Sequence, residues 1–362
     1  MKIVMIVSNP FKPDPRVYKE AKSLVKHGHK VTVIAWDREG EYPKEESIDG
    51  IRVLRIKVKS KYGNFFDFLL KLPFFYLKSL KLLLKEDFDV IHTHDFDTAI
   101  LGLLIRRLKD IRWIYDVHDL YESLVEKENS RAAKVISKLE RIIIDLPDYV
   151  IVVNDAFIRL MRERGRTKPI LVIMNTIEPI KVEKQKSKRF TLFYAGVLSS
   201  GRFILEMIDI AKELRIRLKI AGSGKLEHEV KKRCHDSCLF LGYIPHRKAL
   251  EELSKSHATF AIYTPKILNN LLAAPNKLFE AMCLKVPIIA VKGSVMSKIV
   301  ERHRCGVTVE YEKKDVKEKV RHIMENPKLI KKMGHNGRKG FLKEYTWRNM
   351  EEKLVKLYEG LK

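Results

Sequence analysis

The stretch that decides the fold is Leu218-Lys-Ile-Ala-Gly222-Ser-Gly224-Lys225. It begins as a short apolar run, turns at two glycines and leads into a polar segment with helical composition. This succession is typical of a buried parallel strand that connects to a crossover helix. The stretch therefore predicts an α/β protein built on parallel sheets.

The same alternation of strand and helix patterns extends in both directions from this stretch. Residues 15–26 are expected to form a helix that Gly28 closes. The pattern predicts a fold of two Rossmann-like, doubly wound domains. Further strands are expected at 191–194, 239–241, 259–262, 288–290 and 307–309 in the second half, and at 3–7, 30–35, 51–56, 90–92, 113–116, 149–153 and 170–173 in the first.

The domain boundary is predicted in a polar stretch, residues 178–190, which has no apolar periodicity. A length of 362 residues also favours two domains over one. We expect a first domain over 1–177, a linker over 178–190 and a second domain over 191–344. Residues 345–362 are expected to form a final helix that crosses back to the first domain.

The charge balance predicts an anionic partner. The chain has 71 lysines and arginines against 46 acidic residues, which gives a formal net charge of +25. No helix-turn-helix, zinc finger or RNA-binding motif accompanies this charge, so nucleic acid is not predicted as the partner.

The cysteines and the apolar runs predict a cytoplasmic protein. Four cysteines, Cys234, Cys238, Cys283 and Cys305, are too few for a disulfide scaffold and are expected to be reduced thiols. Metal binding by Cys234, His235 and Cys238 is disfavoured because only one short cluster exists. We find no signal peptide and no uncharged apolar run of about 18 residues, so no membrane span is predicted.

Two glycine-rich turns in the second half are candidates for binding a phosphate. Gly222 and Gly224 follow one predicted strand, and Gly196 and Gly201 follow another. Ligands of doubly wound sheets bind at the carboxyl ends of the strands, where backbone N–H groups can hold a phosphate. Two such turns side by side would converge on one diphosphate, with Arg202 and Lys225 adding positive charge. The alternative is a pair of ordinary turns, and the dinucleotide fingerprint is incomplete because its third glycine is missing.

Histidines follow two predicted strands of the first half. His118 leaves a strand end beside Asp116 and Asp119, and His94 belongs to a polar cluster on the neighbouring strand. A histidine in this place can bond a sugar hydroxyl or accept a proton. Metal binding by these clusters is disfavoured, because the order of the residues matches no known ligand spacing.

The segment 275–290 is the most informative of the chain. A helix that starts after Pro275 places Asn276 and Lys277 at its amino end and Glu280 one turn later. A carboxylate there can accept hydrogen bonds from both hydroxyls of a ribose. The alternative is a solvent-facing helix with one exposed acid.

At this point the chain resembles the GT-B retaining glycosyltransferases of the large family that includes glycogen synthase and many bacterial mannosyltransferases. Seven pieces occur in the family's order over about 290 residues. The resemblance implies two Rossmann-like domains that face each other across a cleft. The matching pieces are 14–21, 89–95, 115–119, 196–202, 220–224, 240–245 and 275–290.

The resemblance also implies roles for individual residues. Arg202 and Lys225 would hold the donor diphosphate, His118 would bond the donor sugar, and Glu280 would bind the ribose. These roles make His118, Arg202 and Lys225 the catalytic candidates. The remaining candidates are Gly196, Gly201, Gly222, Gly224, Asn276 and Lys277 for the donor, and Arg16, His94 and Asp119 for the acceptor side.

The chain departs from the family pattern at two places. The family usually supplies two bases from the turn at Gly196, where only Arg202 is visible, and its first glutamate should fall at residue 272, where Leu272 stands. Either Asn276 and Lys277 take over part of that glutamate's role, which we favour, or the protein binds a nucleotide sugar without transferring it.

The activity implied by the resemblance is transfer of a sugar from a nucleotide-diphosphate donor to a glycan or lipid-linked acceptor. Anomeric configuration is retained, with no protein nucleophile, and no cofactor or metal is expected. The alternatives are a non-catalytic nucleotide-sugar-binding subunit and a sugar-nucleotide epimerase of the same architecture.

Residues 52–85 interleave many bases with aromatic residues and contain one acid, Asp67. Such a segment can lie on an anionic bilayer, which suits an enzyme with a lipid-linked acceptor. It is equally consistent with a core helix whose lysines are solvated, and the sequence leaves both interpretations open.

Overall fold

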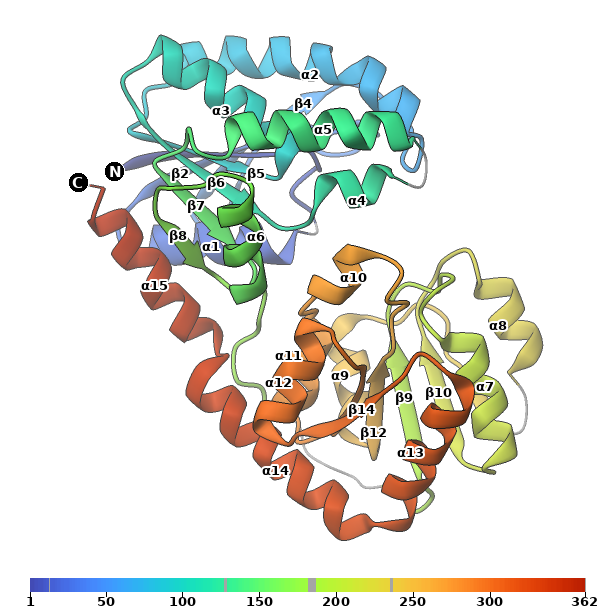
Figure 1. Ribbon diagram of the computed structural model, residues 1–362. Helices are drawn as coiled ribbons and strands as arrows, with labels where there is room; N and C mark the ends of the chain where they lie inside the picture. The colour runs from blue at the N-terminus through green and yellow to red at the C-terminus, as the bar shows by residue number, and fades with distance from the viewer. Residues whose placement is uncertain (13, 127–128, 182–186, 235–236, 362) are drawn as a thin grey trace. The chain divides into compact units, whose positions relative to one another are not determined.

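The computed structural model describes residues 1–12, 14–126, 129–181, 187–234 and 237–361. The chain divides into two compact units (Figure 1). Unit 1 contains Met1–Met174 and Met350–Lys362, and unit 2 contains Asn175–Asn349. Each is a doubly wound α/β unit, as the sequence predicted.

Unit 1 is built on an eight-stranded sheet with the order β3-β4-β2-β1-β5-β6-β7-β8. Neighbouring strands are parallel, except that β3 and β4 are antiparallel. The strands are β1 (Lys2–Val7), β2 (Lys30–Asp37), β3 (Glu45–Ile48), β4 (Ile51–Lys57), β5 (Val90–His94), β6 (Arg112–Val117), β7 (Tyr149–Val152) and β8 (Ile170–Val172).

Helices cover both faces of this sheet (Figure 1). Helix α1 occupies the predicted residues because the Asp14 side chain accepts a hydrogen bond from the Val17 N–H and Pro15 starts the helix. The helices of the unit are α1 (Pro15–Lys26), α2 (Phe65–Lys85), α3 (Phe96–Leu108), α4 (Tyr121–Val125), α5 (Ser130–Ile143), α6 (Asp155–Glu163) and most of α15 (Trp347–Glu359).

The final helix α15 is tied to unit 1 by polar contacts. The Tyr358 hydroxyl lies 2.9 Å from His92 Nδ1, and Lys26 Nζ lies 3.0 Å from Glu351 Oε1. Tyr358 and His92 are both buried. The part of α15 from Met350 to Glu359 therefore completes the unit that the first residues begin.

Unit 2 is built on a six-stranded parallel sheet with the order β11-β10-β9-β12-β13-β14. Its strands are β9 (Thr191–Ala195), β10 (Arg217–Ala221), β11 (Cys238–Phe240), β12 (Ala258–Ala261), β13 (Ile288–Val291) and β14 (Gly306–Val309). Its helices are α7 (Ile204–Glu213), α8 (Glu227–Arg233), α9 (His246–Ser254), α10 (Leu268–Leu272), α11 (Asn276–Cys283), α12 (Val295–His303), α13 (Lys313–Glu325) and α14 (Pro327–Glu344).

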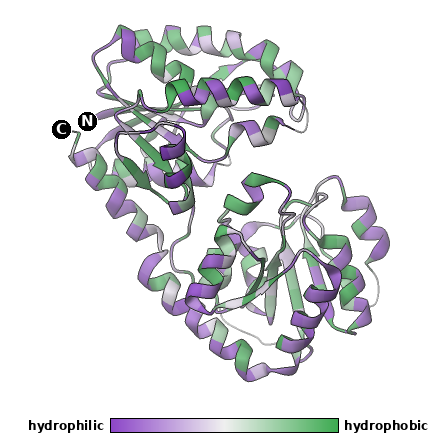
Figure 2. Cartoon of the chain, in the orientation of Figure 1, coloured by the Kyte–Doolittle hydropathy of each residue, from purple (hydrophilic) through white to green (hydrophobic). Residues whose placement is uncertain are grey.

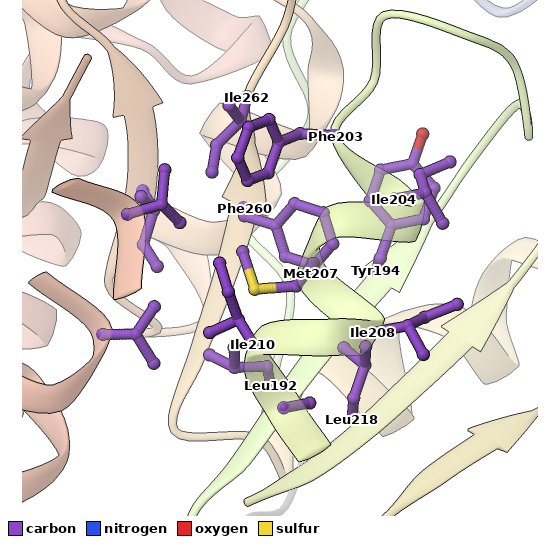
Figure 3. Close-up of a cluster of buried hydrophobic side chains, with 14 of the residues drawn as sticks. Leu192, Tyr194, Phe203, Ile204, Met207, Ile208, Ile210, Leu218, Phe260 and Ile262 are labelled. Carbon is purple, nitrogen blue, oxygen red and sulfur yellow. The ribbon is translucent and has the colours of Figure 1, made fainter. Parts of the chain in front are cut away.

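A cluster of buried apolar side chains fixes the strands of unit 2 (Figure 3). Met207 and Ile210 of α7 belong to the same cluster as Leu192 and Phe260 of the sheet. The Tyr194 and Phe260 rings stack with centroids 5.1 Å apart. The strands of both units are mainly apolar, whereas the helices carry both apolar and polar residues (Figure 2). Each fully buried large side chain contributes about 1.5–3 kcal/mol, so this cluster stabilises the sheet whose strand ends carry the glycine turns.

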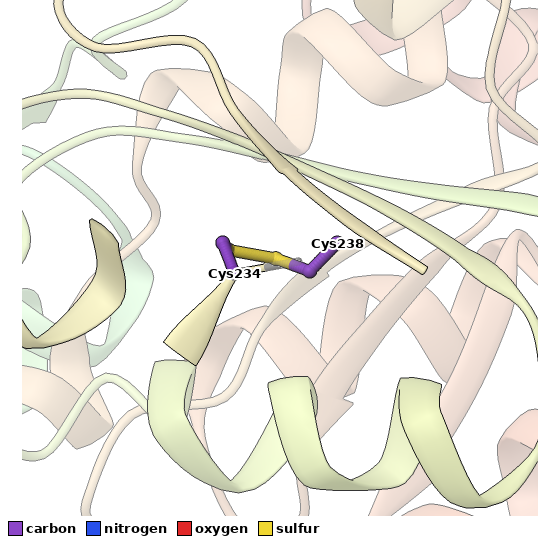
Figure 4. Close-up of a disulfide and its surroundings, with 2 residues drawn as sticks. All are labelled: Cys234 and Cys238. Atoms are coloured by element: carbon purple, nitrogen blue, oxygen red, sulfur yellow. A yellow bond between two sulfur atoms is a disulfide. The ribbon is translucent and has the colours of Figure 1, made fainter. Parts of the chain in front are cut away.

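Two of the four cysteines differ from the expectation of reduced thiols. Cys234 and Cys238 form a disulfide (Figure 4), while Cys283 and Cys305 are free and buried. The physical reason is proximity, since the two Cα atoms lie 4.6 Å apart, within the range that a disulfide spans. The disfavoured metal site loses both thiolates to this bond, and its third member, His235, lies outside the described residues.

No helix in the described part of the chain is both long enough and apolar enough to cross a membrane.

Candidate functional site

The two glycine turns of unit 2 are in direct backbone contact. They follow β9 and β10, which are neighbours in the sheet, and the Gly196 N–H donates to the Ala221 carbonyl at 3.0 Å. A Cβ atom on Gly222 would overlap the carbonyl oxygen of Gly196, and one on Gly224 would lie 2.5 Å from the Leu198 carbonyl oxygen. Only glycine fits at these two positions, which also have φ angles of +138° and +146°.

Two cations gather beside these turns. The Arg202 guanidinium lies 3.9 Å from the centroid of the Tyr263 ring. The Lys277 ammonium lies 3.9 Å from the Tyr194 ring centroid and 5.7 Å from that of Tyr263. A Cβ on Gly196 would be 3.3 Å from Lys277 Nζ, so this ammonium adjoins the first glycine turn.

The charge of this pair is not neutralised by an ion pair. Among the described residues, no carboxylate lies within salt-bridge distance of Arg202 or Lys277. Burial and the nearby Arg202 lower the pKa of Lys277, but Tyr263 and Tyr194 outweigh them and the pKa is raised. Lys277 is therefore charged at neutral pH, and two adjacent positive charges favour an anion between them.

Helix α11 carries two further polar groups of the site. Glu280 is largely buried, and its Oε1 lies 2.8 Å from Nε2 of the exposed His246. Asn276 Oδ1 is buried and has no hydrogen-bond partner among the described residues. Both groups stand within one turn of Lys277, so the helix presents a cation, a carboxylate and an unused acceptor together.

Of the remaining predicted residues of unit 2, Gly201 adjoins the Arg202 turn, whereas Lys225 lies apart from the Tyr263 ring. The Gly201 carbonyl accepts a hydrogen bond from the Thr264 N–H at 2.8 Å, which ties the Arg202 turn to the end of β12. Lys225 is exposed at the second glycine turn. The structure therefore places Lys277, rather than Lys225, against the ring that Arg202 contacts.

In unit 1, His118 is held between two carboxylates. Its Nε2 lies 3.0 Å from Asp116 Oδ2, and its Nδ1 lies 3.4 Å from Asp95 Oδ2. Burial lowers the pKa of His118, but the charges of Asp95 and Asp116 outweigh it and raise the pKa to about 10. Asp95 adopts a positive φ of +65°, which is rare outside glycine. His118 is thus an imidazolium at the end of β6.

The predicted acceptor-side residues occupy different depths of unit 1. Arg16 is buried and donates to both Asp116 oxygens, with its NH2 group 2.8 Å from Oδ1. His94 is buried as well, with Nδ1 3.2 Å from His118 Nε2, whereas Asp119 is exposed. Arg16 and His94 are therefore buried neighbours of the His118–Asp116 pair, and of these three predicted residues only Asp119 is at the surface.

Four ligand-type side chains converge next to this support. Glu20, His92, His94 and Asp116 offer ligand atoms within 4.8 Å of one another. The Arg16 guanidinium binds Asp116 and lies 3.2 Å from Glu20. A metal ion at this place would meet a fixed positive charge, so the arrangement disfavours one.

Three residues of the site were missed in the sequence. They are Tyr194, Tyr263 and His246. Both tyrosines stand at the carboxyl ends of strands, and His246 begins a helix after Pro245. Their positions at strand ends and at a helix start could have indicated site residues. The contacts of their rings could not be predicted, because they depend on the packing of three separate segments.

Family models match most of the chain. The model of Glycosyltransferase Family 4 matches residues 16–180, and the model of Glycosyl transferases group 1 matches residues 176–340. Among curated proteins, the chain is similar to two uncharacterized glycosyltransferases of Methanocaldococcus jannaschii. MJ1607 is 22% identical over 366 residues, covering 94% of this chain and 92% of the relative. MJ1178 is 24% identical over 281 residues, covering 76% of this chain and 77% of the relative.

Solved structures share the fold. The sucrose-phosphate synthase of Thermosynechococcus elongatus aligns with a TM-score of 0.84 and 17% identity, covering 100% of this chain and 99% of that one. Anabaena HepE, solved in complex with UDP-glucose, aligns with a TM-score of 0.75 and 13% identity, covering 99% and 100%.

Proposed function

The chain is a family-4-like glycosyltransferase of the GT-B fold, since two glycosyltransferase models together span residues 16–340; from this premise we propose that it transfers a sugar from a nucleoside-diphosphate donor to a glycan or lipid-linked acceptor. Unit 2 binds the donor in this proposal, and the anomeric configuration is retained.

One observation carries the donor class. Arg202 and Lys277 hold two positive charges beside one aromatic ring and one glycine turn, with no carboxylate paired to either among the described residues. A diphosphate matches this charge and can also accept hydrogen bonds from turn N–H groups. The complex of Anabaena HepE with UDP-glucose supports the same class of ligand.

Lys277 resolves the missing second base of the family pattern in this proposal. The family takes both bases from the turn at Gly196, whereas here the second ammonium reaches that turn from α11. We assign Lys225 a lesser role because its side chain is exposed at the other turn. Glu280 accepts hydrogen bonds from the ribose hydroxyls. The unused Asn276 Oδ1 accepts a hydrogen bond from another hydroxyl of the donor.

Catalysis in this proposal rests on stabilising the leaving diphosphate. Negative charge grows on the diphosphate as the glycosidic bond breaks, and the preorganised cations Arg202 and Lys277 stabilise it. The departing phosphate assists attack of the acceptor on the same face of the sugar, so a protein nucleophile is not required. Leu272 supplies no carboxylate to the transferred sugar, which leaves Asn276 and Lys277 to contact it.

The test combines donor binding with turnover. UDP-, GDP- and ADP-sugars are screened for thermal stabilisation, because a ligand that binds only the folded state raises its stability. With the donor found, release of nucleoside diphosphate is measured with and without acceptor sugars. We expect Arg202→Ala and Lys277→Ala each to weaken donor binding at least about tenfold, the loss of one charge-assisted contact.

Lys212→Ala is the matched control, since Lys212 is an exposed lysine of α7 in the same unit. Lys225→Ala distinguishes the two assignments of the second base, and we expect a smaller effect from it than from Lys277→Ala. Unchanged affinity in both Arg202→Ala and Lys277→Ala would refute the donor site.

A further inference from the structure

Helix α2 exposes a continuous row of large apolar side chains. Phe66, Leu70, Phe74 and Leu77 succeed one another at spacings of four and three residues, which places them on one face of the helix. Together with Leu69 and Leu84 they are 50–70% exposed. Isolated exposed leucines are ordinary, but six on one helix form a patch that needs a function.

The exposed row is separate from the face that holds α2 in the fold. Phe68, Phe75, Ser79 and Leu83 are buried on the opposite side of the helix. The Phe75 ring stacks on Trp36 of β2 with centroids 4.8 Å apart. The fold therefore already uses one face of α2 as a core helix, and this leaves the second apolar face without a partner in unit 1.

Lysines flank the apolar row. Lys78, Lys81 and Lys85 of α2 are exposed, and the helix contains a single acid, Asp67, in its first turn. That carboxylate accepts a hydrogen bond from the Lys61 N–H. The outer surface of α2 is thus apolar along its centre and basic along its side.

The neighbouring helices extend the same chemistry. Helices α2, α3 and α5 form one layer over the sheet of unit 1 (Figure 1). Of the carboxylates in these three helices, Asp97 of α3 and Glu140 of α5 are buried, and Asp67 of α2 is partly exposed. We call this surface the α2–α3–α5 face. Besides the α2 residues, it exposes apolar and basic side chains of α3 and α5, among them Leu104, Arg107, Leu108, Lys134, Lys138 and Ile142.

We propose that the α2–α3–α5 face binds the surface of an anionic lipid bilayer. The phenylalanines and leucines of α2 enter the boundary between headgroups and acyl chains, and the lysines and arginines bind lipid phosphates. Each base near an anionic surface strengthens binding, and each large apolar side chain adds the effect of its own burial. The proposal does not depend on the assigned donor site, because it concerns other residues in the other unit.

The charge of the face selects this partner over two others. A second copy of the chain would bring the same bases against each other, because a two-fold contact pairs a surface with itself. A protein partner fits poorly as well, since the cores of protein interfaces are depleted in lysine. An anionic bilayer satisfies the apolar row and the bases at once.

The test is flotation of the full chain with lipid vesicles. Vesicles of phosphatidylcholine containing about one-third phosphatidylglycerol are compared with vesicles of pure phosphatidylcholine. We expect binding to the anionic vesicles that weakens as salt is raised, and at least tenfold weaker binding to the neutral ones. Leu77→Glu is expected to lower the partition coefficient on anionic vesicles at least tenfold.

Two further variants complete the design. Leu342→Glu places the same charge on an exposed leucine of α14 in unit 2 and is expected to leave vesicle binding unchanged. The triple change of Lys78, Lys81 and Lys85 to Gln is expected to remove much of the salt dependence. The midpoint of thermal unfolding, measured without any ligand, should be equal in all variants, which shows that they are folded and keeps this test independent of the donor site.

Any of three results would overturn the proposal. The first is wild-type protein that stays unbound to anionic vesicles at low salt, and the second is equal binding of Leu77→Glu and Leu342→Glu. The third is a wild-type dimer in sedimentation velocity that Leu77→Glu dissociates, without vesicle binding, since the face would then join two copies of the chain.

Discussion

Among single residues, the role of Glu280 can be tested by comparing two ligands that differ in one ribose hydroxyl. Its carboxylate contacts His246 and stands one turn from Lys277 on α11. In the proposed function this carboxylate receives the ribose hydroxyls. A nucleoside diphosphate with one of those hydroxyls removed should therefore bind less well.

We predict that the wild-type protein prefers a ribonucleoside diphosphate to its 2′-deoxy analogue by about tenfold, the value of one charge-assisted hydrogen bond. Glu280→Gln should lower affinity for the first ligand and reduce the preference. Titration calorimetry measures both affinities. Glu251→Gln, a change at a half-exposed acid of α9, is the control. An undiminished preference in Glu280→Gln would contradict the ribose assignment.

His118 gives a prediction on pH. Its folded-state pKa of about 10 lies above the ordinary value of 6.5, so the folded protein holds this proton more tightly than the unfolded chain. The resulting stability is fully present below pH 6.5 and is lost as pH rises toward 10. Glu20, with its pKa raised to about 8 mainly by burial, acts in the same direction at lower pH.

We predict that the free energy of unfolding falls by a few kcal/mol between about pH 8 and 10. In His118→Gln this fall should be much smaller. Urea denaturation across the pH range measures it, and His228→Gln, at an exposed histidine of α8, controls for a general effect of histidine loss. If the free energy of unfolding fell equally with pH in wild type and in His118→Gln, the pKa of His118 would not be raised in the folded protein.

The sequence indicates the groups at strand and helix ends but not their partners. Gly196, Arg202 and Glu280 could be named because each follows a strand or starts a helix. The rings of Tyr194 and Tyr263 could not, because their contacts with Lys277 and Arg202 join three segments whose distances only the packed sheet sets. For the same reason the sequence indicates Lys277 as a donor residue but does not place its ammonium beside Gly196.

At the scale of elements, the contact between the two glycine turns is the most constrained feature. The turns of β9 and β10 meet so closely that a methyl group on Gly222 would overlap the Gly196 carbonyl oxygen. Substitution therefore imposes a collision between backbones in addition to left-handed strain.

We predict that Gly222→Ala lowers the free energy of unfolding of unit 2 by about 2–4 kcal/mol and weakens donor binding. Gly293→Ala is the control, because Gly293 also has a positive φ, +77°, but has open space around its Cβ position. It should cost only about 1 kcal/mol. Unit-specific hydrogen exchange measures both. Equal losses in the two variants would mean that the turns can separate without penalty.

The elements differ in how well the sequence predicted them. Helix α1 was predicted at its observed bounds because Asp14 and Pro15 mark its start. Strand β3 was missed, because Glu45-Glu-Ser-Ile48 is mostly polar and only its hairpin with β4, through Asp49 and Gly50, makes it a strand. The disulfide was missed because a separation of four residues does not specify that two cysteines face each other.

At the scale of the whole molecule, the division into units does not follow chain order. Residues 350–362 belong with the first 174 residues, and the buried Tyr358 contacts His92 of β5. Removing the end of α15 therefore takes a side chain from the core of unit 1 while leaving unit 2 contiguous.

We predict that a chain ending at Asn349 exchanges amide hydrogens faster in β1 and β5, while β9, β10 and β12 stay protected as in the full chain. Loss of one large buried aromatic side chain costs about 3–5 kcal/mol, enough to shift local opening. Hydrogen exchange with mass spectrometry reads both units in one experiment. Tyr358→Phe, which removes only the hydroxyl, should produce a small effect on β5. Faster exchange in unit 2 alone would contradict the assignment of α15.

The place of α15 also sets the order in which the protein can mature during synthesis. Domains generally fold as they leave the ribosome, the N-terminal one first. Here the earlier-translated unit lacks its closing helix until the residues after Asn349 have been made, while the later-translated unit has all of its own sequence sooner. Chaperones that shield nascent chains would therefore be needed longest by the part of this protein that is made first.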